Sequence, residues 1–349
     1  MEPPQAENRR EHQVEHLMAD AASMVEIYRG GILESVHRGH AVAVRPNGDV
    51  VAKWGDPDRV ILPRSSAKMI QALPLMESGA GANLSSEQLA LACASHSGEL
   101  RHVERVNRWL ADLGLDDDAL LCGPQASRDR ELRHEMIRQG KPVTRVFNNC
   151  SGKHTGFLTL AKHLGASLDY VDPENPVQVA VKAAFEDMTG QESQGFGIDG
   201  CSAPNFATTV RGLARAAAKF AVAGKSTGAR DRAAATLRDA MMKHPELVSG
   251  KGRACAAFMT AANTPFAAKT GAEGVFLAIL PAQEVGLAVK IEDGATRASE
   301  VATAAILTRL GALEATHPVV AQYLKRPIRN WDGLVTGFEQ PTWGLVNGS

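Results

Sequence analysis

Long apolar runs are missing from this chain of 349 residues. No window approaches about 18 uninterrupted apolar residues, so the sequence predicts no transmembrane helix. The opening segment, 1–24, is polar and charged and has no apolar core of a secretory signal, so we expect a flexible N-terminal arm. Internal repeats, low-complexity segments and a linker rich in proline, glycine or serine are also absent. We therefore expect one folded unit that does not act in a membrane.

Cysteine and net charge are scarce as well. The five cysteines form an odd, scattered set, and without a secretory signal this favours a reducing, cytoplasmic compartment with free or metal-bound thiols. The formal net charge is −1, so no global field attracts nucleic acid or an anionic membrane. A small, near-neutral metabolite suits such a surface better than a polyanion. The cysteines are Cys93, Cys122, Cys150, Cys201 and Cys255.

Hairpins are predicted near both ends of the chain. Apolar runs at 41–44 and 50–54 flank Pro46-Asn47-Gly48-Asp49, which is strong turn chemistry. Strand-like segments at 274–280 and 286–291 predict the second hairpin. The middle of the chain is mostly helical, so we expect an α+β fold in which an antiparallel sheet, built from both chain ends, carries a helical lobe. The predicted helices are 85–93, 100–113, 176–188, 205–220, 230–242 and 297–310.

The first candidate for chemistry is Ser65-Ser66-Ala67-Lys68. A helical period begins at Ser65 and is kinked by Pro74, so Lys68 should lie on the same face as Ser65. A serine hydroxyl becomes a good nucleophile only when a neighbouring base takes its proton, and a lysine can be that base if burial lowers its pKa. The alternative is a serine that merely caps the helix.

The second candidate, Lys269-Thr270-Gly271, lies just before the C-terminal hairpin. Serine β-lactamases carry Ser-x-x-Lys followed by a later Lys-Thr-Gly on a sheet-edge strand, and the two motifs occur here in that order. Lys269 should then bind a substrate carboxylate or lower the pKa of a second hydroxyl. The alternative is an exposed lysine that protects an edge strand from aggregation.

Three further polar blocks interrupt apolar sequence. The run 94–99 contains Ser97, which could bridge the nucleophile, a lysine and the leaving group, or could be a simple helix C-terminal turn. The blocks 148–154 and 197–201 contain Cys150 and Cys201, which could ligate a soft or borderline metal. Two thiols that merely lie close together are the equal alternative.

Taken together, the motifs resemble the Rhizobium-type L-asparaginases, the asparaginase II family. The resemblance extends from about Val25 to about Leu313, so we expect a catalytic domain at 25–317 and a tail segment at 318–349. The most specific block is Cys150-Ser151-Gly152-Lys153-His154. The other motifs that carry the resemblance are Arg64-Ser65-Ser66-Ala67-Lys68, Cys93-Ala94-Ser95-His96-Ser97, Asp199-Gly200-Cys201, His244-Pro245-Glu246 and Gly250-Lys251-Gly252-Arg253.

The resemblance implies a fold related to serine β-lactamases and glutaminases, and a homodimer that deamidates asparagine. It implies that Ser65 is the nucleophile with Lys68 as its partner, and that Ser97 and Lys269 form a second serine–lysine pair. The remaining implied residues are a zinc site of Cys150, Lys153 and Cys201 and a substrate pocket of Arg64, His154 and Asp199.

The sequence therefore predicts an L-asparaginase that works through an acyl-enzyme. In this scheme Asp199 holds the substrate α-amino group and Arg64 its α-carboxylate. The alternatives are a glutaminase or β-lactam hydrolase that uses the same dyad, and a non-catalytic protein that binds an amino acid or senses zinc. Release of ammonia from asparagine would separate catalysis from mere binding.

Overall fold

The computed structural model describes residues 20–347, and the predicted arm lies largely outside this range. Its centre is an eight-stranded sheet in the order β11-β12-β1-β2-β10-β9-β8, with β3 paired to β2. Every strand pair in it is antiparallel, as expected from the hairpins at both ends. The strands are β1 (Ala22–Arg29), β2 (Ile32–Val44), β3 (Val50–Trp54), β8 (Ala267–Thr270), β9 (Val275–Leu280), β10 (Val285–Ile291), β11 (Arg326–Arg329) and β12 (Val335–Pro341).

The two predicted hairpins are confirmed. β2 and β3 pair with Ala41 opposite Trp54, and Gly48, at φ 94°, makes the turn between them. β9 and β10 pair with Leu280 opposite Val285. Residues of β9 are buried along its whole length rather than alternately, which shows that both faces of the sheet are covered there.

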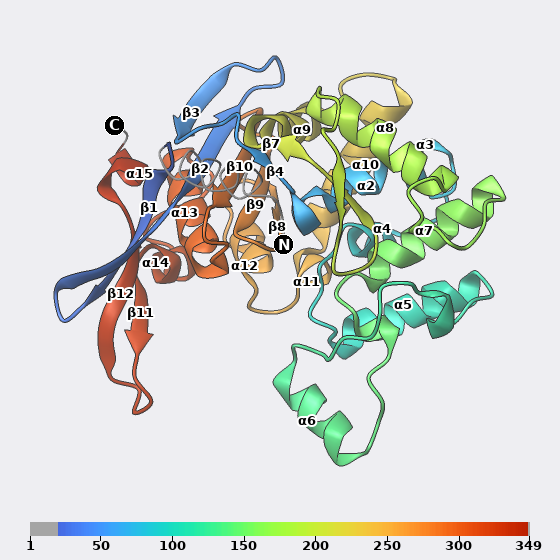
Figure 1. Cartoon of the computed structure of the whole chain (residues 1–349), viewed down its shortest axis with the longest axis horizontal. Helices are drawn as coiled ribbons and strands as arrows, with labels where there is room; N and C mark the ends of the chain where they lie inside the picture. Colours follow the sequence, from blue (N-terminus) through green and yellow to red (C-terminus); the bar gives the residue numbers. More distant parts are fainter. Residues whose placement is uncertain (1–19, 348–349) are drawn as a thin grey trace, which may run out of the picture.

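Helices α9 (Val210–Val222) and α13 (Thr296–Arg309) pack against these strands, and most of the other helices form a lobe beside the sheet (Figure 1). Gly286 of β10 permits the close approach of α9, because a Cβ there would lie 2.1 Å from the carbonyl oxygen of Ala214. No helix within residues 20–347 is long and apolar enough to cross a membrane. The lobe contains α2 (Lys68–Gln71), α3 (Leu73–Glu77), α4 (Ser86–Ala92), α5 (Leu100–Asp112), α6 (Arg130–Arg138), α7 (Ser151–Leu164), α8 (Pro176–Thr189), α10 (Ala229–Lys243), α11 (Pro245–Val248) and α12 (Ala254–Thr260).

Two expectations about segments differ from the structure. The stretch predicted as helix 205–220 begins with the short strands β6 (Pro204–Phe206) and β7 (Thr208–Thr209), which pair with β5 (Phe196–Ile198) and β4 (Val60–Ile61), and helix α9 starts only at Val210. Over its described part, 318–347, the predicted tail segment 318–349 is not a separate tail. It forms α14 (Pro318–Leu324), β11, β12 and α15 (Trp343–Asn347), and β12 pairs with β1 inside the main sheet.

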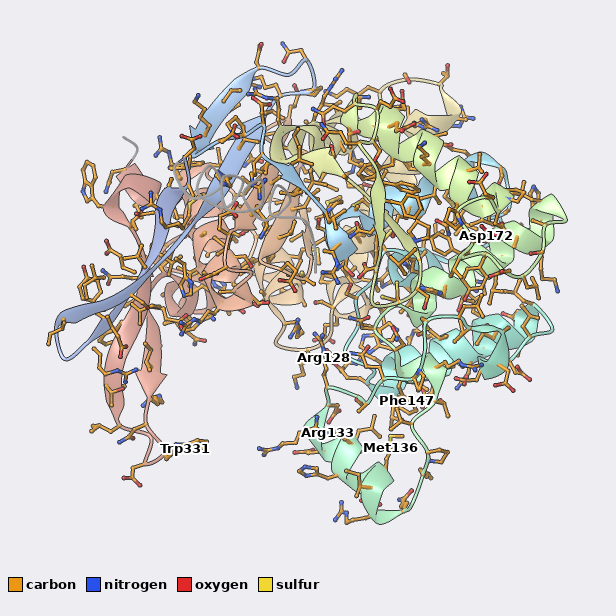
Figure 2. All side chains as sticks on the ribbon, viewed as in Figure 1. Arg128, Arg133, Met136, Phe147, Asp172 and Trp331 are labelled. Carbon is orange, nitrogen blue, oxygen red and sulfur yellow. The ribbon has the colours of Figure 1, made fainter. Side chains whose placement is uncertain are left out.

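Parts of the molecule project from this body. Figure 1 shows the β1–β2 and β11–β12 hairpins extending together to one side, and α6 hanging below the helical lobe. Figure 2 labels Trp331 at the tip of the β11–β12 hairpin and Arg133 and Met136 on α6. The candidate catalytic residues lie elsewhere, where the helical lobe meets strand β8.

Candidate active site

The Ser65 segment lies at the start of a broken helix. A 3-10 helix, η1 (Arg64–Ala67), leads into α2 and then, after a break at Ala72, into α3 with Pro74 in its first turn. This is the predicted helix with the predicted kink. Ser65 is half-buried, whereas Lys68 is buried and points into the protein. One hydroxyl of the segment, that of Ser66, is occupied because it donates to the carbonyl oxygen of Pro63 at 2.6 Å.

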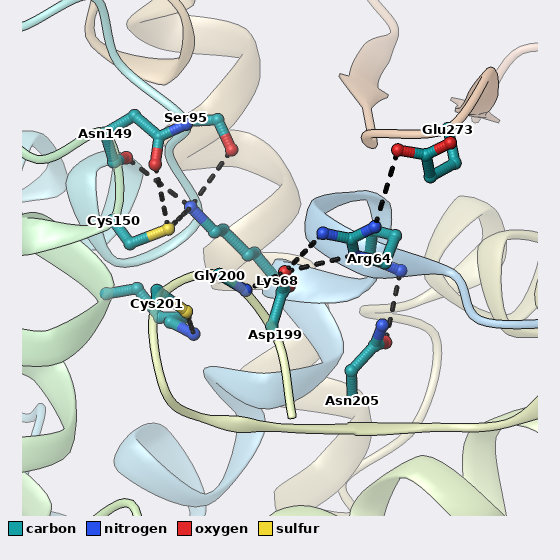
Figure 3. Close-up of polar contacts among 11 residues, drawn as sticks. Arg64, Lys68, Ser95, Asn149, Cys150, Asp199, Gly200, Cys201, Asn205 and Glu273 are labelled. Atoms are coloured by element: carbon teal, nitrogen blue, oxygen red, sulfur yellow. Dashed lines mark hydrogen bonds and ion pairs between the residues drawn. The ribbon is translucent and has the colours of Figure 1, made fainter. Parts of the chain in front are cut away.

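Two buried lysines converge on one serine, and this serine is Ser95. Lys68 Nζ lies 3.0 Å and Lys269 Nζ 2.8 Å from Ser95 Oγ. Ser95 is held in place because its backbone N–H donates to the carbonyl oxygen of Val248 at 2.8 Å. The close-up in Figure 3 shows the Lys68 side chain reaching from its helix toward Ser95 and Cys150. Three segments far apart in the sequence thus meet at a single hydroxyl group.

The two lysines differ in their surroundings. Lys68 Nζ also faces the carbonyl oxygens of Ala94 at 2.5 Å and Asn149 at 3.5 Å, so three oxygens match the three protons of an ammonium group. Burial, reinforced by the nearby Lys68 cation, lowers the pKa of Lys269 from its ordinary value of 10.5 to about 7. The arrangement therefore suits a charged Lys68 that donates to Ser95 and a neutral Lys269 that accepts the proton of Ser95.

The predicted pairing of Ser97 with Lys269 is wrong in this structure. The hydroxyl of Ser97 donates instead to the carbonyl oxygen of Ser249 at 2.9 Å, and Lys269 contacts Ser95. The sequence run 94–99 contains both serines, and in the folded chain it is Ser95 that faces the lysines. No signal in the sequence distinguishes them.

The three predicted metal ligands lie together. Lys153 Nζ lies 3.1 Å from Cys201 Sγ, and a hydrogen bond from the Cys150 thiol, together with Lys153, holds the pKa of Cys201 well below its ordinary value. Burial would lower the pKa of Lys153, but the thiols of Cys201 and Cys150 raise it. Cys150 Sγ also lies 3.1 Å from Lys68 Nζ, so this thiol cluster adjoins the serine–lysine centre.

Two thiols and an amine are a chemically reasonable donor set for zinc, provided that the amine is neutral when it binds. Within residues 20–347, no group of three or more His, Cys, Asp or Glu side chains could hold a metal ion. The predicted set contains only two residues of these types and a lysine. Zinc at this place therefore stays a prediction.

His154, expected in the substrate pocket, lies behind the thiol cluster. Its side chain is completely buried, and its Nδ1 lies 2.9 Å from the hydroxyl of Tyr170. Burial and the neighbouring Lys153 cation lower the pKa of His154 to about 4, so its ring is neutral near neutral pH. The structure thus packs His154 against Tyr170 rather than beside Arg64 and Asp199.

Arg64 and Asp199, the other two predicted substrate ligands, bind each other. Arg64 Nε and Nη2 donate to Asp199 Oδ1 at 3.0 and 2.8 Å, and Arg64 Nη1 lies 3.9 Å from Glu273 Oε1 (Figure 3). The side-chain oxygen of Asn205 accepts from the backbone N–H of Arg64 at 3.1 Å and helps to hold its unusual φ of 53°. Sequence reasoning missed both Asn205 and Glu273, because neither belongs to a motif with the catalytic residues.

Comparison with known proteins identifies the family. The family model of L-asparaginase II matches residues 25–340. The chain therefore belongs to the L-asparaginase II family and is an asparaginase-type amidohydrolase. The match extends beyond the range of 25–317 expected for the catalytic domain and includes β11 and most of β12. No curated protein matches the sequence.

Solved structures give a weaker likeness. A β-lactamase from Mycobacterium bovis is 15% identical, with 75% of this chain and 89% of that chain covered and a TM-score of 0.40. Mglu in its native form is 16% identical, with 92% and 76% covered and a TM-score of 0.45. A class C β-lactamase from Rhodobacter sphaeroides is 14% identical, with 83% and 95% covered and a TM-score of 0.38. At these TM-scores the likeness carries no argument about this chain.

Proposed function

We propose that this protein hydrolyses the side-chain amide of L-asparagine to L-aspartate and ammonia through an acyl-enzyme on Ser65. The single observation that carries the mechanism is the Lys68–Ser95–Lys269 centre, in which one hydroxyl group lies within hydrogen-bond distance of two buried amines. Family membership supports the substrate class. Ser65 is a suitable nucleophile because it is half-buried and lies one helical turn before Lys68, which belongs to this centre.

In the first step, Ser65 Oγ attacks the amide carbon of the substrate. Its proton passes to Ser95 Oγ while the proton of Ser95 moves to neutral Lys269. Breakdown of the tetrahedral intermediate breaks the C–N bond, and the same proton returns through Ser95 to the leaving nitrogen, which departs as ammonia. Lys68 is then a fixed cation that orients Ser95, rather than the base that the sequence suggested.

In the second step, water attacks the ester carbon of the acyl-enzyme. Its proton follows the same path through Ser95 to Lys269 and is returned to Ser65 Oγ as aspartate leaves. Both steps thus use one base, and neither requires an external proton donor. A base with a pKa near the working pH is the most effective one, and the pKa of about 7 at Lys269 satisfies this requirement.

The substrate α-ammonium group fits best at Asp199. Asp199 Oδ1 accepts from Arg64 and from the backbone N–H of Gly200 at 2.7 Å, which leaves Oδ2 to accept from an ammonium group. Arg64, which the sequence suggested for the α-carboxylate, then acts by orienting Asp199, since its guanidinium group is already shared between two carboxylates.

Measurement of ammonia tests the function directly. Purified protein should release ammonia from L-asparagine and, much more slowly, from L-glutamine, because one extra methylene group moves the amide carbon away from Ser65. Discrimination based on a single methylene group is about 10–200-fold in rate. Faster release from glutamine would favour the glutaminase alternative, turnover of nitrocefin would favour a β-lactam hydrolase, and release from none of them would favour a binding or zinc-sensing protein.

We also propose a zinc ion held by Cys150, Lys153 and Cys201. The support is the convergence of two thiols and an amine beside the catalytic centre, and a bound zinc would supply Lewis-acid polarisation and orientation of the substrate. Zinc binds thiolates and a neutral amine, so Cys150, Lys153 and Cys201 must each be deprotonated in the complex. Zinc affinity should therefore fall as the pH falls.

Elemental analysis of protein purified without chelator should find about one zinc per chain. Cys150→Ser and Cys201→Ser should lose most of it, while Cys93→Ala, which removes another buried thiol, should keep it. Metal removal should weaken substrate binding without unfolding the chain, because the core does not depend on the site. A protein that takes up no zinc at neutral pH would reduce the cluster to two thiols near the substrate.

Two finer expectations belong to this proposal. We infer a homodimer, supported by family membership, and light scattering of the eluting protein should give twice the mass of 37.1 kDa. We also infer a cytoplasmic location, supported by five cysteines that are all buried and free of disulfides.

A further inference from the structure

Glu273 lies on the turn that joins strands β8 and β9, four residues after Lys269 in the sequence. This turn packs directly on the segment that carries Ser65. A Cβ added to Gly271 would lie 2.7 Å from the carbonyl oxygen of Pro63 and 3.3 Å from the backbone nitrogen of Ser66. The turn can approach so closely only because residue 271 is glycine, and Glu273 consequently stands at the edge of the catalytic centre.

The position of Glu273 is fixed by the surrounding structure. Lys290 Nζ donates to its carbonyl oxygen at 2.8 Å. Gly294 leaves room for its carboxylate, since a Cβ at Gly294 would lie 2.7 Å from Glu273 Oε2. Glu273 also has a φ of 57°, a conformation that a non-glycine residue adopts at an energetic cost.

Backbone strain is concentrated around this place. Four non-glycine residues within 20–347 have positive φ, and Arg64, Ser202 and Glu273 are three of them. Ser202 lies on the turn that carries Asp199, since its N–H donates to the Asp199 carbonyl oxygen at 2.8 Å. Strained residues of this kind persist where the surrounding structure holds them, and they cluster at ligand-binding sites.

Two carboxylates share one guanidinium group at this edge. Arg64 lies between two carboxylates, Asp199 at 2.8 Å and Glu273 at 3.9 Å, while Lys290 donates to the backbone carbonyl oxygen of Glu273. The Asp199 side chain is 15% exposed and that of Glu273 is 67% exposed, so the Glu273 carboxylate faces the solvent beside Arg64. This arrangement favours an incoming ammonium group and disfavours a carboxylate.

We propose that Glu273 is a specificity-determining residue that, with Asp199, selects substrates bearing a free α-ammonium group. The inference rests on the proposed amide hydrolysis at Ser65 and names what the same site recognises. Asparagine within a peptide chain, and amides that lack the amino group, would not gain from the second carboxylate.

The test compares Glu273→Gln with the unchanged protein on two substrates. L-asparagine carries the α-ammonium group, and succinamic acid has the same chain without it. For asparagine, kcat/KM should fall about tenfold, mainly through KM, because a charge-assisted contact becomes a neutral one. For succinamic acid it should stay the same or rise. An equal fall on both substrates, or no change on asparagine, overturns the inference.

A matched control is Glu284→Gln. Glu284 is also an exposed glutamate with a positive φ (53°), but it lies on the remote β9–β10 turn and pairs with Lys225. Glu284→Gln should leave kcat/KM unchanged for both asparagine and succinamic acid. If Glu273→Gln fails to fold, Glu273→Gly is the second variant, because glycine relieves the strained φ and also lacks the carboxylate. It must show the same difference, a fall in kcat/KM for asparagine but not for succinamic acid. Failure of the unchanged protein on both amides would reject the proposed function itself, whereas an active protein without this difference rejects only the role of Glu273.

Discussion

Ser65→Ala and Ser95→Ala should each reduce turnover of asparagine by about 10³-fold or more, for different reasons. Ser65→Ala removes the atom that forms the acyl-enzyme. Ser95→Ala leaves that atom in place but removes the hydroxyl group between Lys68 and Lys269, so no group relays the proton. Both variants should keep the fold, because each loses only a hydroxyl group and its hydrogen bonds, worth about 1 kcal/mol apiece.

The two variants are separated by a diazoketone analogue of asparagine that alkylates a nucleophile, followed by the mass of the intact protein. Ser95→Ala should still gain the adduct slowly, whereas Ser65→Ala should gain none. Ser97→Ala is the third arm, and it should retain most activity because the Ser97 hydroxyl group donates to the carbonyl oxygen of Ser249 and meets no lysine. A loss in Ser97→Ala as large as that in Ser95→Ala would restore the pairing that the sequence suggested.

The fold was largely predictable where local pattern decides it. The β2–β3 hairpin follows from its turn sequence, and Ser85 and Gln88 form a capping box at the start of α4, within the predicted helix 85–93. The β12 strand was not predicted. Its residues, such as Glu339 and Gln340, are polar, and it is a strand because β1 and β11 offer partners on either side. That information lies in the tertiary structure, since β1 is more than 300 residues away in the sequence.

The site was predictable as a set of motifs but not as a set of contacts. Ser65, Lys68 and Lys269 follow from residue spacing, and the structure brings both lysines together. Sequence could not show that the hydroxyl group between them belongs to Ser95, because a shift of two residues in a loop changes no motif. The sequence also could not show that Lys68 faces three oxygen acceptors while the pKa of Lys269 is lowered. Both depend on burial, which arises only when the helical lobe packs against β8.

Lys269→Met should reduce activity to a trace and at the same time stabilise the protein. A buried amine whose pKa falls from 10.5 to about 7 costs the folded state about 4 kcal/mol at neutral pH, since one pKa unit corresponds to about 1.4 kcal/mol. Methionine of similar length fills the same space without this cost. The hydrogen bonds to Ser95 and to the carbonyl oxygen of Thr270 are lost, and they offset about 1–2 kcal/mol of the gain.

The stability difference between Lys269→Met and the unchanged protein should depend on pH. Between about pH 7 and 10.5 the unfolded chain binds a proton at Lys269 that the folded chain does not, so the stability of the unchanged protein rises with pH over this window. The melting temperature of Lys269→Met should therefore exceed that of the unchanged protein by several degrees at pH 6–7, and the difference should shrink toward pH 10. Lys243→Met, at an exposed helical position, should show no such convergence.

In the unchanged protein, the pH dependence of activity should follow the protonation of Lys269. Because the neutral amine is the base, kcat/KM should rise with pH through about 7 and then level off, and the trace activity of Lys269→Met should lack this rise. Thermal melts and pH–rate profiles of the same three proteins measure both effects. A Lys269→Met protein that is less stable at pH 7, or whose residual activity still rises through pH 7, would mean that Lys269 is charged in the folded state and that the proton accepted from Ser95 goes to another group.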